Sequence, residues 1–309
     1  MSKINRTAAS KMQEYVAAHG FDDMQAVIRY AISLTDHYGE AVGALACQMY
    51  EETAAAQGVT VQTAEMADLP TLEEVRKAVY GAKKTSEKEV SKAIERLVKR
   101  VGADTTLKNA ERDGAQFAWV PHGDTCAFCI TLASRGWQYM SKNALRNGHA
   151  EHIHANCDCQ YAIRFDDKST VAGYDPDRYK KIYDNMPGRD SKDKINALRR
   201  MTTGENALTL DQIELTIDLD NTPQILGQKT PAGWNTYLKE LGFTVGPLGR
   251  GQFQGIPFED GGGYCIHYRG DGYMQYHPEG GHHKEEYYKI SSGATGTRRF
   301  HLDGSPKDD

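Results

Sequence analysis

The cysteine and histidine residues near the middle of the chain limit its possible folds more than any other feature. Cys126 and Cys129 form a C-x-x-C pair, Cys157 and Cys159 form a C-x-C pair, and His154 stands shortly before the second pair. Structural zinc sites hold the ion with four nitrogen or sulfur ligands in a tetrahedron, and a C-x-x-C turn supplies two of them. The pattern therefore predicts a structural zinc ion, with no part in catalysis.

Five candidate ligands compete for four positions, and the spacing does not choose among them. The set that we expect is Cys126, Cys129 and Cys157 with either His154 or Cys159. Three alternatives are weaker. Disulfides would need an oxidising compartment, and a redox C-x-x-C needs a βαβ context that the sequence lacks. A catalytic zinc needs an open coordination position and a general base, and acidic residues near the cluster keep that alternative open.

The composition indicates a polar chain that is still apolar enough to fold. The 309 residues are enough for two domains, or for one domain with helical extensions. Of these residues, 39% are hydrophobic and 26% are charged, a balance that allows a hydrophobic core. The net charge of -5 argues against a protein that binds nucleic acid through bulk electrostatics, because such proteins are usually basic. No run of 18 apolar residues occurs and the first residues lack an apolar core, so neither a membrane span nor a secretory signal peptide is predicted.

The apolar pattern predicts an α+β protein whose N-terminal two-thirds are mostly helical. The helical N-terminal region carries two capping-box patterns, Thr71 with Glu74 and Ser86 with Glu89. Short apolar runs and turns then replace the helical period around the zinc module, and helical signals return after it. The expected divisions are a helical region 1–115, a Cys/His zinc module 116–170, a helical linker 171–225 and a β-rich α+β domain 226–309.

The last 80 or so residues read as a separate domain with one helix and a sheet. Pro231 is expected to begin the helix and Gly242 to end it. Cys265 stands alone in a strand pattern and is expected to be a small core residue. The expected strands are separated by Gly and Asp and span residues 252–258, 263–269, 273–278, 286–291 and 297–302.

The Cys/His segment resembles the MuF-like minor head proteins of tailed phages, the head morphogenesis family. The hallmark is Thr-Cys-x-x-Cys followed by His-x-x-Cys-x-Cys, which corresponds here to Thr125, Cys126, Cys129, His154, Cys157 and Cys159. The likeness covers residues 1 to roughly 205 and is strongest from 104 to 180. It implies a subunit with an extended helical N-terminal part, located inside the capsid near the portal, with portal or capsid proteins as partners.

The C-terminal domain departs from this resemblance, because residues 226–309 lack the helical, lysine-rich end that the family would have. Some members carry a C-terminal domain that resembles the tips of polymorphic toxins, and the change in composition fits that idea. Such a protein would leave the virion with the DNA and act in the bacterial cytoplasm. An immunity protein would then be a further partner.

A cluster of chemically active side chains in this domain favours a metal-independent ribonuclease. Such an enzyme needs a base for the 2′-OH proton, an acid for the leaving oxygen and a cation for the phosphorane-like charge. The order of His, Lys and Ser/Thr is similar to that of barnase/EndoU-like toxin nucleases. The expected roles are general base for His282, electrostatic stabiliser for Lys289 and phosphate ligand for Thr297 or Arg298, with His277 as a further candidate.

Two other functions remain open for this domain. It could be a docking module without enzymatic activity that binds the portal, a scaffold or cargo, because histidines on a Tyr-rich strand are more often surface residues than catalysts. An ADP-ribosyltransferase toxin is the third possibility. That fold needs a catalytic Glu after a Ser-rich strand, whereas Glu285 and Glu286 precede the Ser-rich turn.

Overall fold

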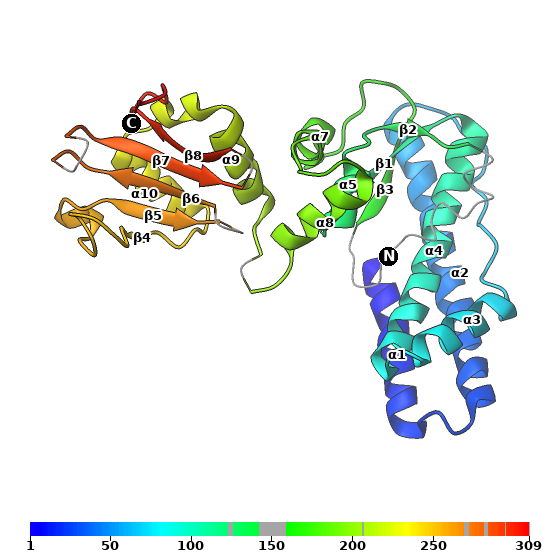
Figure 1. The fold of residues 1–309 in the computed structure, drawn as a ribbon. Helices are drawn as coiled ribbons and strands as arrows, with labels where there is room; N and C mark the ends of the chain where they lie inside the picture. Colours follow the sequence, from blue (N-terminus) through cyan, green and yellow to red (C-terminus); the bar gives the residue numbers. More distant parts are fainter. Residues whose placement is uncertain are drawn as a thin grey trace. The chain divides into compact units, whose positions relative to one another are not determined.

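The chain divides into two units, each built around a hydrophobic core of its own. The structure is a computed structural model that describes residues 1–122, 126–141, 159–205, 207–268, 272–280, 284–293 and 295–308. The first unit comprises Met1–Thr125 and Arg135–Asp177, and the second comprises Cys126–Ser134 and Arg178–Asp309. The α+β fold class is confirmed, because helices dominate the first unit and a five-stranded sheet lies in the second (Figure 1).

Four helices form the larger part of the first unit, and their apolar faces meet in one core. Asp23 begins the long second helix by accepting a hydrogen bond from the Ala26 amide at 2.9 Å. Thr71 and Glu74 form the expected capping box, whereas Ser86 stands at the helix start without a side-chain cap, so the second capping-box prediction is wrong. The helices are α1 (Ser2–His19), α2 (Met24–Ala56), α3 (Leu72–Lys83) and α4 (Glu87–Asp113).

Helices α2 and α4 pack closely, and an extended segment, residues 57–71, runs along them. A Cβ on Gly102 of α4 would lie 2.6 Å from Val42 of α2, so glycine is needed at this contact. Buried polar groups of α4 hold the extended segment. The Asn109 side chain donates to the Glu65 carbonyl at 2.8 Å and accepts from the Glu65 amide at 2.9 Å, and Thr105 accepts from the Ala67 amide at 3.0 Å.

A small antiparallel sheet completes the first unit. Its strand order is β2-β1-β3, and Trp119 of β1 pairs with Tyr161 of β3. Gln57, just after α2, binds the backbone of β3 and of the residue that follows it. Its side-chain amide donates to the Ile163 carbonyl at 3.1 Å and accepts from the Phe165 amide at 2.9 Å. The strands are β1 (Gln116–Val120), β2 (Gln138–Tyr139) and β3 (Gln160–Arg164).

The second unit begins with helices that precede its sheet. Arg178 of α7 forms ion pairs with Asp211 and Glu214 of α9, and α5 packs against α8. The elements are α5 (Ala127–Ala133), α7 (Pro176–Asp184), α8 (Ser191–Thr202), α9 (Leu210–Asn221), the short helix η2 (Pro223–Gln228) and α10 (Pro231–Glu240). Pro231 does begin α10, and Gly242 follows its end with a positive φ, as predicted.

Five antiparallel strands form the C-terminal sheet, in the sequential order β4-β5-β6-β7-β8. Four of the five expected strands are confirmed. The strand expected at 252–258 is wrong, since Gly251 and Gly255 adopt positive φ and turn the chain there. A two-residue strand before these turns takes the edge position instead. The elements are β4 (Gly246–Pro247), η3 (Phe258–Asp260), β5 (Tyr264–His267), β6 (Tyr273–His277), β7 (Tyr287–Ser292) and β8 (Gly296–Phe300).

Helices α9 and α10 cover one face of this sheet (Figure 1). Leu219 of α9 and both Trp234 and Leu238 of α10 are buried against the strands. The Trp234 ring nitrogen donates to the Leu226 carbonyl at 2.9 Å, so its buried polar group is satisfied. The sheet residues of this core are Tyr264, Ile266, Met274, Tyr276, Tyr288, Ile290 and Phe300. Among the described helices, none combines the length and the apolar run needed to cross a bilayer.

Candidate functional site on the C-terminal sheet

The face of the sheet opposite to α9 and α10 is polar. Side chains alternate between the two faces of a strand, so the residues between the core positions point away from the helices. We call these residues the open face. They are Cys265, His267, Tyr273, Gln275, His277, Tyr287, Lys289, Ser291, Thr297 and Arg299. All except Cys265 and Tyr287 are partly or fully exposed.

Strand register places four of these residues in one row across four strands. His267 pairs with Tyr273, Tyr273 pairs with Ser291, and Ser291 pairs with Thr297. Neighbouring side chains in such a row lie about 5 Å apart at their Cβ atoms. The ring centroids of His267 and Tyr273 are 6.2 Å apart, and Thr297 donates a hydrogen bond to the Ser291 hydroxyl at 3.1 Å.

The next row of the open face carries its positive charge. Cys265, Gln275, Lys289 and Arg299 are aligned by the same register. Gln275 lies 3.6 Å from the sulfur of Cys265, and burial raises the pKa of this thiol, so it is not predisposed to act as a thiolate. Lys289 and Arg299 therefore supply the charge of this row, and they stand on adjacent strands.

Tyr273 belongs to the first row, and its ring lies close to Lys289 of the second row. The Lys289 ammonium is 5.4 Å from the centroid of its ring. Burial raises the pKa of Tyr273, but interactions of its hydroxyl with the side chains of Thr297, Lys289 and Ser291, together with the charge of Lys289, outweigh burial and leave the pKa below its ordinary value. A phenol that titrates more easily than usual, beside a cation, is typical of functional sites.

The remaining open-face residues extend the site toward the other end of the strands. The His277 ring stacks on Tyr287 with centroids 4.6 Å apart and planes 2° apart, and its Nε2 lies 3.1 Å from Gln275 Oε1. At the opposite end, a cavity of about 1200 Å³ opens beside His267, and both Arg200 of α8 and Glu205 contribute to its lining. The open face thus offers rings for stacking at the His277 end of its strands.

Three carboxylates of this unit are paired with residues that do not belong to the open face. None of the described strand residues of the open face is acidic. Glu286 accepts a hydrogen bond from Tyr276 at 2.6 Å, Glu285 pairs with Lys307, and Asp220 of α9 pairs with Arg298. The residues from 226 to 309 carry nearly balanced charge. In contrast, the charged side chains on the described strands of the open face, Lys289 and Arg299, are both positive, and this asymmetry favours an anionic ligand.

The structure places three of the five predicted catalytic residues on one face of the sheet, with His277 toward the far end of the strands from Thr297. Lys289, Thr297 and His277 all lie on the open face. Arg298 points to the helix-covered face, where its guanidinium donates to the Asp220 carbonyl at 2.9 Å. His282 lies outside the described residues.

Sequence reasoning missed His267 and Tyr273, which the register places in one row with Ser291 and Thr297. The signal was present in the sequence: both residues alternate with core positions in strands that had been predicted correctly. The chemistry alone did not distinguish them from other histidines and tyrosines.

Of the predicted zinc ligands, Cys126 and Cys129 are a described pair in the second unit. Cys126 is the N-cap of α5, and its sulfur lies 3.5 Å from that of Cys129. Cys159 is buried and belongs to the first unit, while His154 and Cys157 lie outside the described residues. In the part of the chain that the structure describes, no group of three or more His, Cys, Asp or Glu side chains gathers as a metal site.

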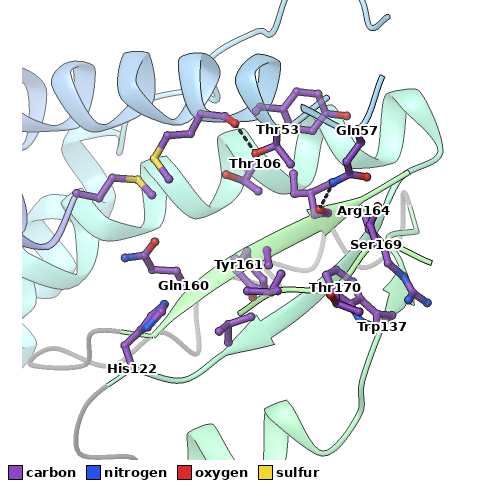
Figure 2. Close-up of a pocket in the computed structure, with 17 residues that line it drawn as sticks. Thr53, Gln57, Thr106, His122, Trp137, Gln160, Tyr161, Arg164, Ser169 and Thr170 are labelled. Carbon is purple, nitrogen blue, oxygen red and sulfur yellow. Dashed lines mark hydrogen bonds between the residues drawn. The ribbon is translucent and has the colours of Figure 1, made fainter. Parts of the chain in front are cut away.

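The first unit contains a cavity of about 280 Å³ beside β3 (Figure 2). Its polar lining is largely engaged within the fold. Gln57 is bonded to the backbone of β3, and the Arg164 guanidinium, 4.6 Å from the centroid of the Trp137 ring, donates to Gln116. These contacts join β3 to β1 and to the end of α2.

Comparison with known proteins identifies the first part of the chain. The family described as VG15 protein matches residues 1–186, which is more than half of the 309 residues and ends before the C-terminal sheet. Neither a curated protein nor a solved structure matches the chain. The chain therefore belongs to the VG15 protein family, a family of phage-type proteins.

Proposed function

We propose that this chain is a MuF-like minor head protein of a tailed phage, and that its C-terminal unit cleaves RNA on the open face without a metal ion. Membership of a phage-type family supports the first part, together with the sequence hallmark around the Cys/His cluster. The second part is carried by one observation: His267, Lys289 and Thr297 stand in adjacent rows of an exposed sheet face whose described strands hold no carboxylate.

The reaction that fits these groups is attack of a ribose 2′-OH on the adjacent phosphate. The O–P bond to the 2′ oxygen forms, the bond to the 5′ oxygen breaks, and a 2′,3′-cyclic phosphate and a 5′-OH result. His267 takes the 2′-OH proton, the part that sequence analysis had assigned to His282. Lys289 and Arg299 stabilise the extra negative charge of the transition state.

Hydroxyl groups and rings of the open face would position the RNA. Ser291 and Thr297 lie in the same row as His267, beyond Tyr273, and can donate hydrogen bonds to a phosphate oxygen. The His277–Tyr287 stack offers a surface for an unpaired base. With nearly balanced charge from residue 226 onward, affinity would come from this local constellation and would be modest.

The test is RNA cleavage by the purified full-length chain in buffer without divalent cations. Total bacterial RNA is incubated with the wild type and with Lys289→Met, and the products are resolved on a gel and probed for cyclic phosphate ends. Loss of an electrostatic stabiliser is expected to lower the rate about 100-fold or more. Lys239→Met is the matched control, since Lys239 pairs with Glu259 on exposed surface away from the open face.

Cleavage that requires Lys289 and tolerates Lys239→Met would support the ribonuclease. If the folded wild type leaves RNA intact, the enzymatic part of the proposal is wrong and the open face is better explained as a surface that docks on another head protein. Cleavage that needs added Mg²⁺ would also contradict the proposed mechanism.

We also propose that Cys126 and Cys129 bind a structural zinc ion. Two thiolates on one tetrahedral zinc, each about 2.3 Å from the metal, lie about 3.8 Å apart. The observed 3.5 Å between the Cys126 and Cys129 sulfurs fits this spacing and is far from a disulfide bond. The remaining ligands would come from His154, Cys157 and Cys159. Zinc bound there would stabilise the fold directly.

A further inference from the structure

We infer that Tyr273 is the general acid of the open face, which protonates the 5′ oxygen as it leaves the phosphate. This inference rests on the proposed ribonuclease function and adds the proton donor that the reaction needs. Three features of the structure carry it: the central position of Tyr273, the groups that surround its hydroxyl, and its relation to His267.

Tyr273 lies next to His267, close enough for the two side chains to act on the same phosphate. The two residues are direct neighbours on β5 and β6, with ring centroids 6.2 Å apart. Cleavage needs two proton-transfer groups on opposite sides of one phosphate, because the attacking and leaving oxygens are in line. Two neighbouring rings on one exposed sheet face can contact the same phosphate without movement of the backbone.

The surroundings of Tyr273 favour loss of its proton. The side chains that face it are His267 from β5, Lys289 and Ser291 from β7, and Thr297 from β8. Lys289 is positively charged and the two hydroxyls can donate to a phenolate oxygen. These interactions hold the pKa of Tyr273 below its ordinary value despite partial burial, so the phenol is a stronger acid than a tyrosine in water.

His267 and Tyr273 together account for both proton transfers of the reaction. Neutral His267 gains the proton of the 2′-OH, and Tyr273 loses its proton to the 5′ oxygen. The products are a cyclic phosphate, a 5′-OH, an imidazolium and a phenolate beside Lys289. Exchange with water then returns both side chains to their starting states.

The test compares two substrates that differ in their need for an acid. Bacterial RNA has a poor leaving group, whereas nucleoside 3′-(4-nitrophenyl) phosphates release a nitrophenolate that needs no proton. For the full-length chain, Tyr273→Phe is expected to lower kcat on RNA about 100-fold or more and to change the nitrophenyl reaction less than about threefold. His267→Ala is expected to slow both reactions. Tyr237→Phe on α10 is the matched control.

The pH profile gives a second readout. A general acid must be protonated, so the wild-type rate on RNA should fall as the pH rises through the pKa of Tyr273, and this alkaline limb should vanish in Tyr273→Phe. The same pKa is measured without substrate from the difference in ultraviolet absorbance between wild type and Tyr273→Phe. A value at or above that of an ordinary tyrosine, about 10, would overturn the inference whether or not the chain cleaves RNA.

The outcomes separate this inference from the function on which it rests. If the wild type cleaves RNA and Tyr273→Phe cleaves it equally fast, Tyr273 is not the acid while the ribonuclease stands. If Tyr273→Phe slows both substrates alike, the hydroxyl positions the phosphate and donates no proton. A wild type that cleaves neither substrate removes the proposed function and this inference together.

Discussion

At the scale of single residues, Asp113 is a clear example of a carboxylate that stabilises the fold. It closes α4 and accepts a hydrogen bond from Tyr50 of α2 at 2.9 Å and another from Arg112 at 2.8 Å. The Arg112 hydrogen bond, with that from Tyr50, outweighs burial and holds the pKa of Asp113 below its usual range. The charged form is therefore favoured in the folded state.

We expect Asp113→Asn to lower the free energy of unfolding by about 2 kcal/mol at pH 7. Because the folded-state pKa is depressed, the stabilisation is present above the unfolded pKa of about 3.9 and is lost as pH falls through the folded-state value. Urea unfolding at pH 7 and pH 3 should therefore show a difference from wild type that shrinks in acid. Asp68→Asn, at an exposed position, is the control. A difference that is independent of pH would contradict this account.

Replacing Cys126, one of the proposed zinc ligands, tests the zinc proposal. We expect Cys126→Ser to reduce the zinc content of the purified chain and to lower its melting temperature markedly, because the binding free energy of a structural zinc is folding free energy. Metal content is measured by mass spectrometry and melting by calorimetry. Cys47→Ser, outside the cluster, is the control. A Cys126→Ser variant with unchanged zinc and unchanged melting would refute the assignment.

At the scale of elements, two glycines in neighbouring helices should respond in opposite ways to the same substitution. A Cβ on Gly102 of α4 would meet Val42 of α2 at 2.6 Å, whereas a Cβ on Gly81 of α3 meets nothing within 4 Å. Alanine has the higher helix propensity by about 1 kcal/mol in both places. Only at Gly102 does crowding between helices oppose that gain.

We therefore expect Gly81→Ala to raise the free energy of unfolding by about 0.5–1 kcal/mol and Gly102→Ala to lower it by about 1–2 kcal/mol. Chemical denaturation followed by circular dichroism measures both. Stabilisation by Gly102→Ala would mean that α2 and α4 move apart at little cost, contrary to the close packing described above.

At the scale of the whole molecule, the two units have separate cores. Ile94 is fully buried in the core of the first and Leu238 in that of the second. We expect calorimetry to show two transitions. Ile94→Ala and Leu238→Ala should each lower a different one, because each leaves a cavity that costs about 2–5 kcal/mol. If both variants shifted one shared transition, the units would unfold as one.

The sequence by itself determined most of the local structure, and it predicted classes of chemistry that stay predictions. Helical spacing, the Thr71 cap and Pro231 identified helices correctly, because these signals act within a few residues. The strand expected at 252–258 failed for a local reason as well, since Gly251 and Gly255 turn the chain there. The Cys126–Cys129 pair indicated zinc, and the basic and hydroxyl residues near the C-terminus indicated phosphate chemistry.

Only the tertiary structure decided which side chains share a site. Arg298 and Arg299 are adjacent in one strand, and a period of two tells only that they face opposite sides. The packing of α9 and α10 makes one side the core, where Asp220 binds Arg298, and leaves Arg299 on the open face. The same register joins His267 and Tyr273 to Ser291 and Thr297, residues far apart in sequence. The turns between consecutive strands fix this register, but which face becomes the core depends on where α9 and α10 pack.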